Sequence, residues 1–285
     1  MPTTIRRAVR ADAPMLGEIC YRAFKAIAEA HNYVPDFPDP EFAARIMHLM
    51  LGHDQFYGVA AEHDARLVGS NFLDERNPIS GIGPITVDPA MQDDGVGRAL
   101  MLAVMKRSDE RGFPGLRLVQ AGYHRRSLAL YLKLGFEVRE PLVCLQGPPI
   151  GLVASDHQVR AATLADLPEC NRLCARVHGH ARGGELADAI ECGDARLVER
   201  AGRITGYATP IAFFGHAVAE TNDDLKALLG TAESIKGPGV LVPARNGELV
   251  RWCLSRGLRI TQTMTLMTIG LYNEPDGSWL PSATY

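Results

Sequence analysis

Residues 85–100 read Ile85-Thr86-Val87-Asp88-Pro89-Ala90-Met91-Gln92-Asp93-Asp94-Gly95-Val96-Gly97-Arg98-Ala99-Leu100. An apolar run typical of a β-strand ends at an Asp-Pro pair, and a turn with two glycines leads into a helix. The first N–H groups of a helix have no partner inside the helix and carry a partial positive charge, so they attract anions. Glycine at both turn positions lets the backbone approach a ligand closely. The stretch therefore predicts a diphosphate-binding site at a strand-to-helix junction.

Two common phosphate-binding loops do not fit this stretch. A Walker loop needs Gly-Lys-Ser/Thr, whereas Arg98-Ala99 follows Gly97. A Rossmann fingerprint needs a third glycine, and Leu100 stands at that position. Taken alone, a strand, a glycine turn and a helix can also form a tight connection that binds nothing.

A second stretch narrows the choice, because residues 123–137 read Tyr123-His124-Arg125-Arg126-Ser127-Leu128-Ala129-Leu130-Tyr131-Leu132-Lys133-Leu134-Gly135-Phe136-Glu137. Together the two stretches resemble the GCN5-related N-acetyltransferase (GNAT) superfamily. Gln92, Gly95 and Gly97 match its Gln/Arg-x-x-Gly-x-Gly/Ala pyrophosphate loop, and the Leu-Tyr-x-x-Leu-Gly-Phe helix end matches its second coenzyme motif. The resemblance is close over residues 3–147 and weak over the remainder, which is typical of a tandem-domain member with a degenerate second domain.

The resemblance implies a mixed α/β (α+β) fold of two tandem GNAT-like domains. Each has a twisted, mostly antiparallel sheet flanked by helices, and the central strands of domain one splay apart. It also implies acetyl-CoA (coenzyme A) as co-substrate and no metal. The residues expected to hold acetyl-CoA are Ile85, Thr86, Val87, Gln92, Asp93, Asp94, Gly95, Val96, Gly97, Arg98, Ser127 and Tyr131. Asp93 and Asp94 depart from the basic residues often found in this loop, and carboxylates turned toward a diphosphate would weaken its binding.

Acetyl transfer to an amine needs a neutral amine, hydrogen-bond donors for the developing oxyanion and a proton for the departing thiolate. By resemblance Tyr131 is the expected general acid, with packing against the sheet as the alternative. The family has no fixed position for the base, and Asp74 and Glu75, before the predicted coenzyme strand, are the leading candidates. Three further candidates are Glu29, His31 and His124.

The stretch 31–40 is rich in proline and aromatic residues and stands where the family has its variable acceptor loop. Tyr33 and Phe37 are therefore expected to line the acceptor pocket, although a packed surface connection fits the same pattern. The expected reaction is transfer of an acetyl group to the amine of a small molecule or a protein. A non-catalytic acyl-CoA-binding or regulatory protein is the alternative, and transfer to a hydroxyl or of a longer acyl chain uses the same residues.

Composition excludes several other classes of protein. The chain has 285 residues, 46% hydrophobic and 22% charged, with a net charge of −3, which does not favour a nucleic-acid partner. No apolar run reaches the roughly 18 residues of a membrane span, and the N-terminus lacks the apolar segment of a signal peptide. Six irregularly spaced cysteines indicate free thiols in a reducing compartment, so a cytoplasmic protein is expected.

The beginning of the chain is repeated 154 residues later: Ile5-Arg6-Arg7-Ala8 and Asp12-Ala13-Pro14 correspond to Val159-Arg160-Ala161-Ala162 and Asp166-Leu167-Pro168. The repeat predicts a catalytic domain over 1–147, a linker over 148–157 and a degenerate domain over 158–285. The second copy of the diphosphate turn, residues 219–228, has neither glycine and carries three acidic residues. Domain two is therefore expected not to bind coenzyme A, but to cover domain one, shape its pocket or form a homodimer interface.

Periodicity predicts the elements of domain one: strands 4–9, 56–61, 66–74, 80–88, 115–120 and 136–146, and helices 12–30, 41–51, 96–111 and 125–134. In domain two, Cys170, Cys174 and His178 follow one stripe of a helix. Metal ligands can be arranged in this way, but cysteine is also a small hydrophobic residue suited to a core face. The packing interpretation is favoured, because Cys20 at the repeated position has no such histidine.

Overall fold

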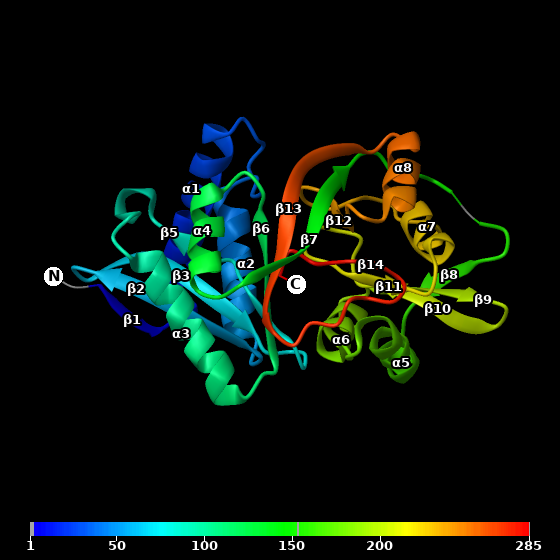
Figure 1. Ribbon diagram of the computed structural model, residues 1–285, viewed down its shortest axis with the longest axis horizontal. Helices are drawn as coiled ribbons and strands as arrows, with labels where there is room; N and C mark the ends of the chain where they lie inside the picture. The colour runs from blue at the N-terminus through cyan, green and yellow to red at the C-terminus, as the bar shows by residue number, and fades with distance from the viewer. Residues whose placement is uncertain (1–2, 153, 285) are drawn as a thin grey trace.

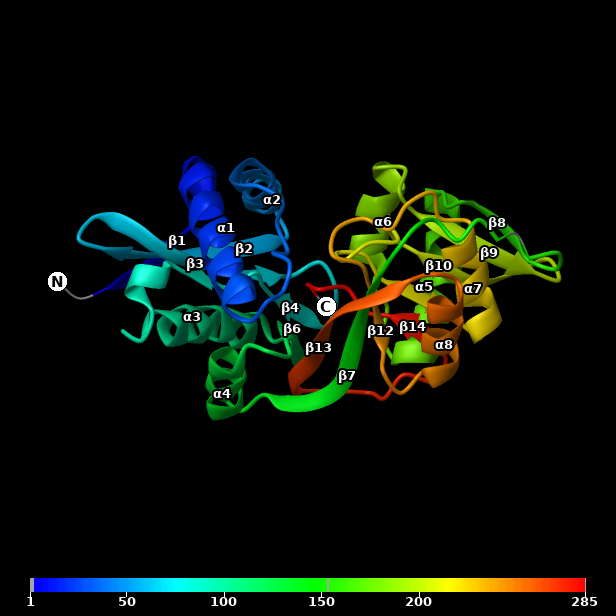
Figure 2. The same ribbon diagram turned by 90° about the horizontal axis from the view of Figure 1, so that it is seen from above.

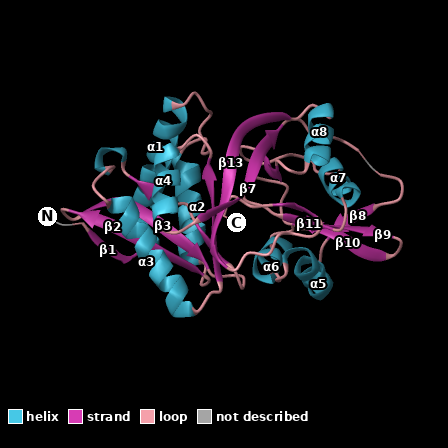
Figure 3. Ribbon diagram, viewed as in Figure 1, coloured by secondary structure: helices cyan, strands magenta, loops and turns pink. Residues whose placement is uncertain are grey.

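The computed structural model describes residues 3–152 and 154–284 and shows two mixed α/β halves side by side along the long axis of the molecule (Figure 1). The N-terminus lies at the far end of the first half, and the chain ends between the two halves. Strands form the centre of each half and helices cover them (Figure 3). This confirms the expected mixed α/β fold with two similar halves.

The first half contains seven strands and four helices within the described residues: β1 (Thr4–Arg7), α1 (Ala13–Ala30), α2 (Pro40–Gly52), β2 (Phe56–His63), β3 (Arg66–Asp74), β4 (Ser80–Ile82), β5 (Thr86–Val87), α3 (Val96–Arg111), β6 (Gly115–Ala121), α4 (Arg125–Lys133) and β7 (Glu137–Gln146). The helix boundaries agree with the predicted ranges to within one residue. The predicted strand 80–88 is instead two short strands, β4 and β5, separated by residues 83–85.

The second half follows a similar order, with one strand before its third helix where the first half has two, and with a further strand at its end: β8 (Gln158–Ala161), α5 (Leu167–His178), α6 (Gly183–Glu191), β9 (Arg196–Arg200), β10 (Arg203–Ala208), β11 (Ala217–Ala219), α7 (Asn222–Gly230), β12 (Val240–Pro243), α8 (Gly247–Ser255), β13 (Arg259–Gly270) and β14 (Ser278–Leu280). The sequence repeat has a structural counterpart at the start of each half. Arg6 binds Asp12 at 2.7 Å, and Arg160 binds Asp166 at 2.8 Å, so the same ion pair joins the first strand to the first helix twice.

The central sheet crosses from one half to the other. Its strand order is β1-β2-β3-β4-β6-β13-β7-β12, so β13 of the second half lies between β6 and β7 of the first. In return β7 lies between β13 and β12, and each half completes its sheet with a strand of the other (Figures 1 and 2). The domain boundaries 1–147, 148–157 and 158–285 stay a prediction, and the hydrogen bonds of β13 and β7 run across them.

The sheet of the first half opens at its centre. β4 pairs in parallel with β6 through Ser80 and Gly81, whereas β5 pairs with β3 and makes no ladder with β6 among the described residues. The strand that leads into α3 is therefore separated from β6, as expected for splayed central strands. A gap between two strands leaves backbone groups available for a ligand.

Helices cover both faces of this sheet. Figure 2 shows α1 and α2 on one side and α3 and α4 on the other. The first pair buries Leu16, Met47 and Phe72 in one core, and the second pair buries Leu100 and Phe136 in another. Within the described residues, none of the helices combines the length and the apolar character that crossing a membrane requires.

Candidate active site

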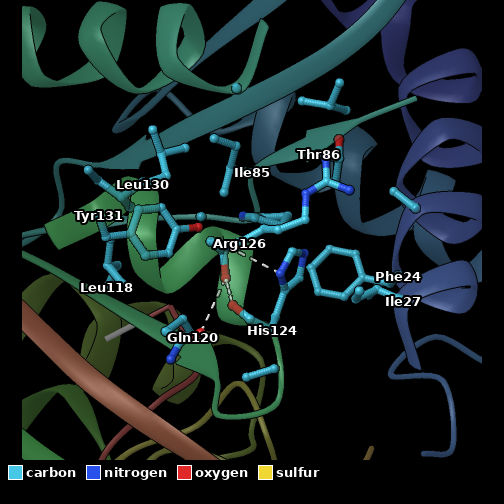
Figure 4. A pocket seen from close by; sticks show the side chains of 18 of the residues that line it. Phe24, Ile27, Ile85, Thr86, Leu118, Gln120, His124, Arg126, Leu130 and Tyr131 are labelled. Carbon is cyan, nitrogen blue, oxygen red and sulfur yellow. Dashed lines mark hydrogen bonds between the residues drawn. The ribbon is translucent and has the colours of Figure 1, made fainter. Parts of the chain in front are cut away.

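A cavity of about 620 Å³ lies where the sheet opens, between α1, the β5 segment, β6 and α4. Figure 4 shows Phe24 and Ile27 of α1 on one side and Tyr131 of α4 on the opposite side, with Ile85 and Thr86 between them. The second half closes part of the wall through Phe213, Phe214, Met264, Ala283 and Thr284. Residues from both halves therefore form one cavity.

The strand-to-helix junction has an open helix start. α3 begins directly after Gly95, whose φ of 77° lies in the left-handed region, and no side chain caps the helix. A Cβ added to Gly95 would meet nothing within 4 Å, and one added to Gly97 would approach Leu130 and Val87 only to 3.7 Å. The N-terminus of α3 thus offers uncapped backbone N–H groups beside open space, which suits an anion.

Most residues predicted to hold the coenzyme line this cavity: Ile85, Thr86, Val87, Gln92, Asp93, Gly95, Gly97, Arg98, Ser127 and Tyr131. Asp94 and Val96 are not among the lining residues. Asp94 is exposed on the outside of the loop, and Val96 is buried in the core beneath α3. Adjacent residues of a helix point in different directions, so Val96 faces the sheet while Gly97 faces the cavity.

An ion pair joins the junction to α4. The Arg126 guanidinium binds the carboxylate of Asp93 at 2.7 Å, and both residues line the cavity. Asp93 has a φ of 76°, so the loop reaches the left-handed region twice within three residues. Asp93 thus holds the Arg126 guanidinium beside the loop that leads into α3.

Tyr131 is buried and its hydroxyl points into the cavity (Figure 4). Its ring contacts Phe136 edge-on, with centroids 6.1 Å apart. Burial raises the pKa of Tyr131, because the phenolate would lie in an apolar environment. The hydroxyl therefore stays protonated and able to donate over the physiological pH range.

A hydrogen-bonded pair in the cavity wall joins Ser127, which was predicted to contact the coenzyme, to Gln120, which was not predicted. The Ser127 hydroxyl lies 3.2 Å from Oε1 of Gln120 and 2.8 Å from the carbonyl oxygen of His124. The amide nitrogen of Gln120 is buried and has no hydrogen-bond partner among the described residues. Gln120 sits on β6, across the opening from β5, and its side chain lines the cavity while its amide nitrogen is buried.

The predicted bases lie elsewhere. Nε of Arg76 binds Asp74 at 2.9 Å, and Nε of Arg107 binds Glu75 at 2.6 Å. Neither carboxylate is among the residues that line the cavity. Asp74 is the last residue of β3, where this strand pairs with β4, and Glu75 follows it; β5 pairs with β3 farther back, at Gly69 and Ser70. Of the three further candidates, only His124 lines the cavity, and burial lowers its pKa.

The two residues predicted for the acceptor pocket differ in position. Phe37 lines the cavity, whereas Tyr33 supports it from behind by stacking on Tyr123, with ring centroids 4.3 Å apart. Asp36, directly before Phe37, also lines the cavity and is 9% exposed. Asp36 was not predicted, because burial of an aspartate in a proline-rich loop leaves no local sequence pattern.

Comparisons with known proteins agree with this geometry. A model of the acetyltransferase (GNAT) family matches residues 21–136, which include the uncapped helix start and Tyr131. Two curated relatives are mycothiol acetyltransferases. The protein from Thermomonospora curvata is 36% identical over 90 residues, which are 31% of this chain and 30% of that protein. The protein from Nocardiopsis dassonvillei is 32% identical over 93 residues, 32% of this chain and 28% of that protein. The matched segment spans less than a third of either relative.

Solved structures match the whole chain in fold. A protein from Pyrococcus horikoshii assigned as an acetyltransferase has a TM-score of 0.77 at 17% identity, covering 97% of this chain and 94% of that one. A tandem GNAT protein from the clavulanic acid biosynthesis pathway has a TM-score of 0.54 at 10% identity, covering 94% and 98%. At these identities the likeness concerns the fold, and it extends across both halves. Residues 21–136 therefore match the acetyltransferase (GNAT) family, and almost the whole chain has the fold of solved proteins that include a tandem GNAT protein.

Proposed function

We propose that this protein is an acetyl-CoA-dependent N-acetyltransferase that transfers an acetyl group to the amine of a small molecule or a protein. The observation that carries the proposal is the single cavity. It joins an uncapped helix N-terminus, a buried tyrosine hydroxyl and an aromatic chamber that contains the Asp36 carboxylate. The chamber is lined by Phe24, Phe37 and Phe214, and apart from Phe214 all these groups lie within the segment that matches the family. The position in the cytoplasm is part of the proposal and is supported by the six free cysteines.

The residues around the junction fit coenzyme A. The uncapped amides at the start of α3 would bind the diphosphate, because Gly95 and Gly97 leave the space above them open. The backbone of β5, separated from β6, would pair with the pantetheine arm. Gln92, Arg98 and Arg126 line the same part of the cavity. The bound coenzyme supplies the activated acetyl thioester.

Domain two is proposed not to bind coenzyme A. At its equivalent junction the N-terminus of α7 is capped by Thr221, and Thr221 and Asp224 form a reciprocal capping box. Asp224 is fully buried and also accepts a hydrogen bond from Thr205 at 2.6 Å. Side chains of the protein itself thus occupy the N–H groups that a diphosphate would need, and they carry the wrong charge.

Tyr131 is proposed as the general acid that gives a proton to the departing thiolate. Its hydroxyl points into the cavity, and burial keeps it protonated. Gln120 accepts the hydrogen bond of the Ser127 hydroxyl in the wall of the same cavity. Asp74 and Glu75 are disfavoured as the base, because an arginine holds each of them outside the cavity.

Release of free coenzyme thiol by the full-length protein tests the proposal. Acetyl-CoA is mixed with a panel of primary amines, and the thiol is titrated with a chromogenic reagent; a protein-only blank corrects for the exposed Cys192. We expect amine-dependent thiol release. Tyr131→Phe should lower kcat about a hundredfold, the order of a lost general acid, and leave the Kd for coenzyme A unchanged. Coenzyme binding without thiol release for every amine would instead support a non-catalytic acyl-CoA-binding protein.

A further inference from the structure

Within the described residues, one carboxylate lies at the end of the cavity formed by α1 and the loop that follows it, that of Asp36. It lies in the loop between α1 and α2 and is 9% exposed. Its Oδ1 accepts a hydrogen bond of 3.0 Å from Nε2 of Gln262, on β13 of the second half. Within the described part of the chain, its Oδ2 has no donor and no lysine or arginine pairs with it. Burial of a carboxylate without a charged partner is costly for the fold.

The titratable groups that face Asp36 are all acids. Tyr123 belongs to the segment after β6, Cys20 to α1 and Cys144 to β7, and the negative charge of Asp36 adds to the effect of burial in raising the pKa of each. None of these groups supplies a positive charge. Burial also raises the pKa of Asp36 itself to about 6, while the hydrogen bond from Gln262 acts in the opposite direction. Among the described residues, Asp36 is therefore the group that brings a negative charge to this end of the cavity at neutral pH.

The wall around this charge is apolar and aromatic. Phe24 contacts Phe37 edge-on at a centroid distance of 5.2 Å, and Phe37 lies 6.5 Å from Phe214 of the second half. Met264 and Ile27 complete the surroundings of the chamber. Such a wall favours an apolar ligand body, and the single carboxylate favours a cation.

We propose that Asp36 binds the ammonium group of the acceptor and accepts its proton, and that the acceptor is a cationic amine on an apolar, preferably aromatic, body without a carboxylate of its own. This inference rests on the proposed acetyltransferase function and names its acceptor class. A carboxylate on the acceptor would be repelled by Asp36, and it would have no cation to pair with in the aromatic wall. Gln262 is the positioning residue that orients the carboxylate.

The proton balance is complete. The ammonium loses one proton to Asp36, and the neutral nitrogen forms the C–N bond to the acetyl carbonyl carbon as the C–S bond breaks with its electron pair on sulfur. The second proton lost by nitrogen is matched by the one that the thiolate gains through Tyr131. The products are the acetamide, the free thiol and one proton that Asp36 returns to the solvent. A carboxyl with a pKa near 6 is ionised, and hence able to accept, at neutral pH.

The test uses two acceptors with the same aromatic body, 2-phenylethylamine and phenylalanine, which differ in the carboxylate. The full-length protein should use 2-phenylethylamine with a kcat/KM at least tenfold higher. Asp36→Asn keeps the shape and an acceptor for Gln262 but removes the charge. It should lower kcat/KM for 2-phenylethylamine about a hundredfold, without changing the Kd for coenzyme A. The wild-type profile of kcat/KM should fall below pH 6, and this fall should be absent in Asp36→Asn.

Controls separate this role from folding and from the proposed function. Glu41→Gln neutralises an exposed carboxylate five residues away and should behave as wild type. Because the folded-state pKa of Asp36 is raised, its contribution to the free energy of unfolding falls as the pH rises from 3.8 to about 6. Asp36→Asn should therefore melt at the same or a higher temperature at pH 8.

Three outcomes would each overturn the inference. They are a melting temperature of Asp36→Asn below that of the wild type at pH 8, wild-type kinetics of Asp36→Asn, and no turnover of 2-phenylethylamine by a protein that acetylates other amines. Absence of turnover with every amine would overturn the proposed function instead.

Discussion

Asp93 and Arg126 show how one residue pair can control the binding of an anion. The pair spans the opening between the junction loop and α4 at 2.7 Å, with side chains 80% and 48% exposed. An exposed ion pair of this kind is weak, so the guanidinium can exchange one anionic partner for another. A diphosphate at the start of α3 would compete with Asp93 for Arg126.

Removing the charge of Asp93 should therefore tighten coenzyme binding. For Asp93→Asn we expect the Kd of coenzyme A to fall roughly threefold in low salt, because Arg126 is released and a repulsive charge is lost. Asparagine also tolerates the left-handed backbone at this position. Asp94→Asn is the matched control, since it removes a charge from the same loop without touching Arg126. Calorimetric titration that gives equal values for the two variants would contradict this competition.

At the scale of elements, the two strand-to-helix junctions show how the same local fold is opened or closed. The first has Gly95 before an uncapped α3, and the second has Thr221 before α7 with a complete capping box. In the second, Arg200 adds a hydrogen bond of 3.2 Å to the buried Asp224. One helix start is available to a ligand, and the other is satisfied by the protein, because an N-cap side chain takes the same N–H groups as an anion.

A negative charge introduced at the open helix start tests whether this site binds an anion. Gly97→Asp and Gly97→Asn add side chains of nearly equal size in the first turn of α3, where the added Cβ finds ordinary contacts at 3.7 Å. Both should weaken coenzyme A binding, and the aspartate should weaken it about tenfold more, through repulsion of the diphosphate at short range. Both should keep the wild-type unfolding midpoint. Equal Kd values for the two variants would show that no anion binds there.

For the whole molecule, the exchange of β7 and β13 makes the two halves one unit. β13 pairs with β6 over residues 264–270 and with β7 over residues 259–268, so either half alone would lose a central strand. Met264 lines the cavity and Gln262 holds Asp36, and both reach the first half on this strand. Because the sheet is shared, the stability of each half and the shape of the chamber around Asp36 depend on the other half.

A core substitution in the first half should therefore also lower the stability of the second half. Leu16 is fully buried in the first half, whereas both tryptophans, Trp252 and Trp279, belong to the second. Leu16→Ala should lower the free energy of unfolding by about 2–5 kcal/mol and shift the tryptophan-monitored midpoint together with the circular dichroism. Leu49→Ala, at a position 66% exposed on α2, should shift neither. A tryptophan transition that stays in place in Leu16→Ala would show that the halves unfold independently.

Local sequence was enough for the helices of the first half and for the open strand-to-helix junction. Helix limits follow from periodicity and from residues such as Gly112, which ends α3 at a φ of 71°. The junction at 85–100 was recognisable because a helix start, its glycines and its preceding strand are contiguous in the chain. The predicted strand 80–88 was too long, since pairing with β6 for one part and with β3 for the other is decided by neighbours distant in sequence.

The burial of Asp36 in the cavity wall and the exchanged strands could not be predicted, because both depend on contacts between residues far apart in the chain. Asp36 meets Gln262 across 226 positions, and its burial arises only when β13 crosses from the second half. Asp74 and Glu75 looked suitable by position, yet Arg76 and Arg107 engage them through side-chain packing that no local pattern reports. Backbone chemistry at a helix start is local, whereas the burial and partners of a charged side chain are properties of the folded whole.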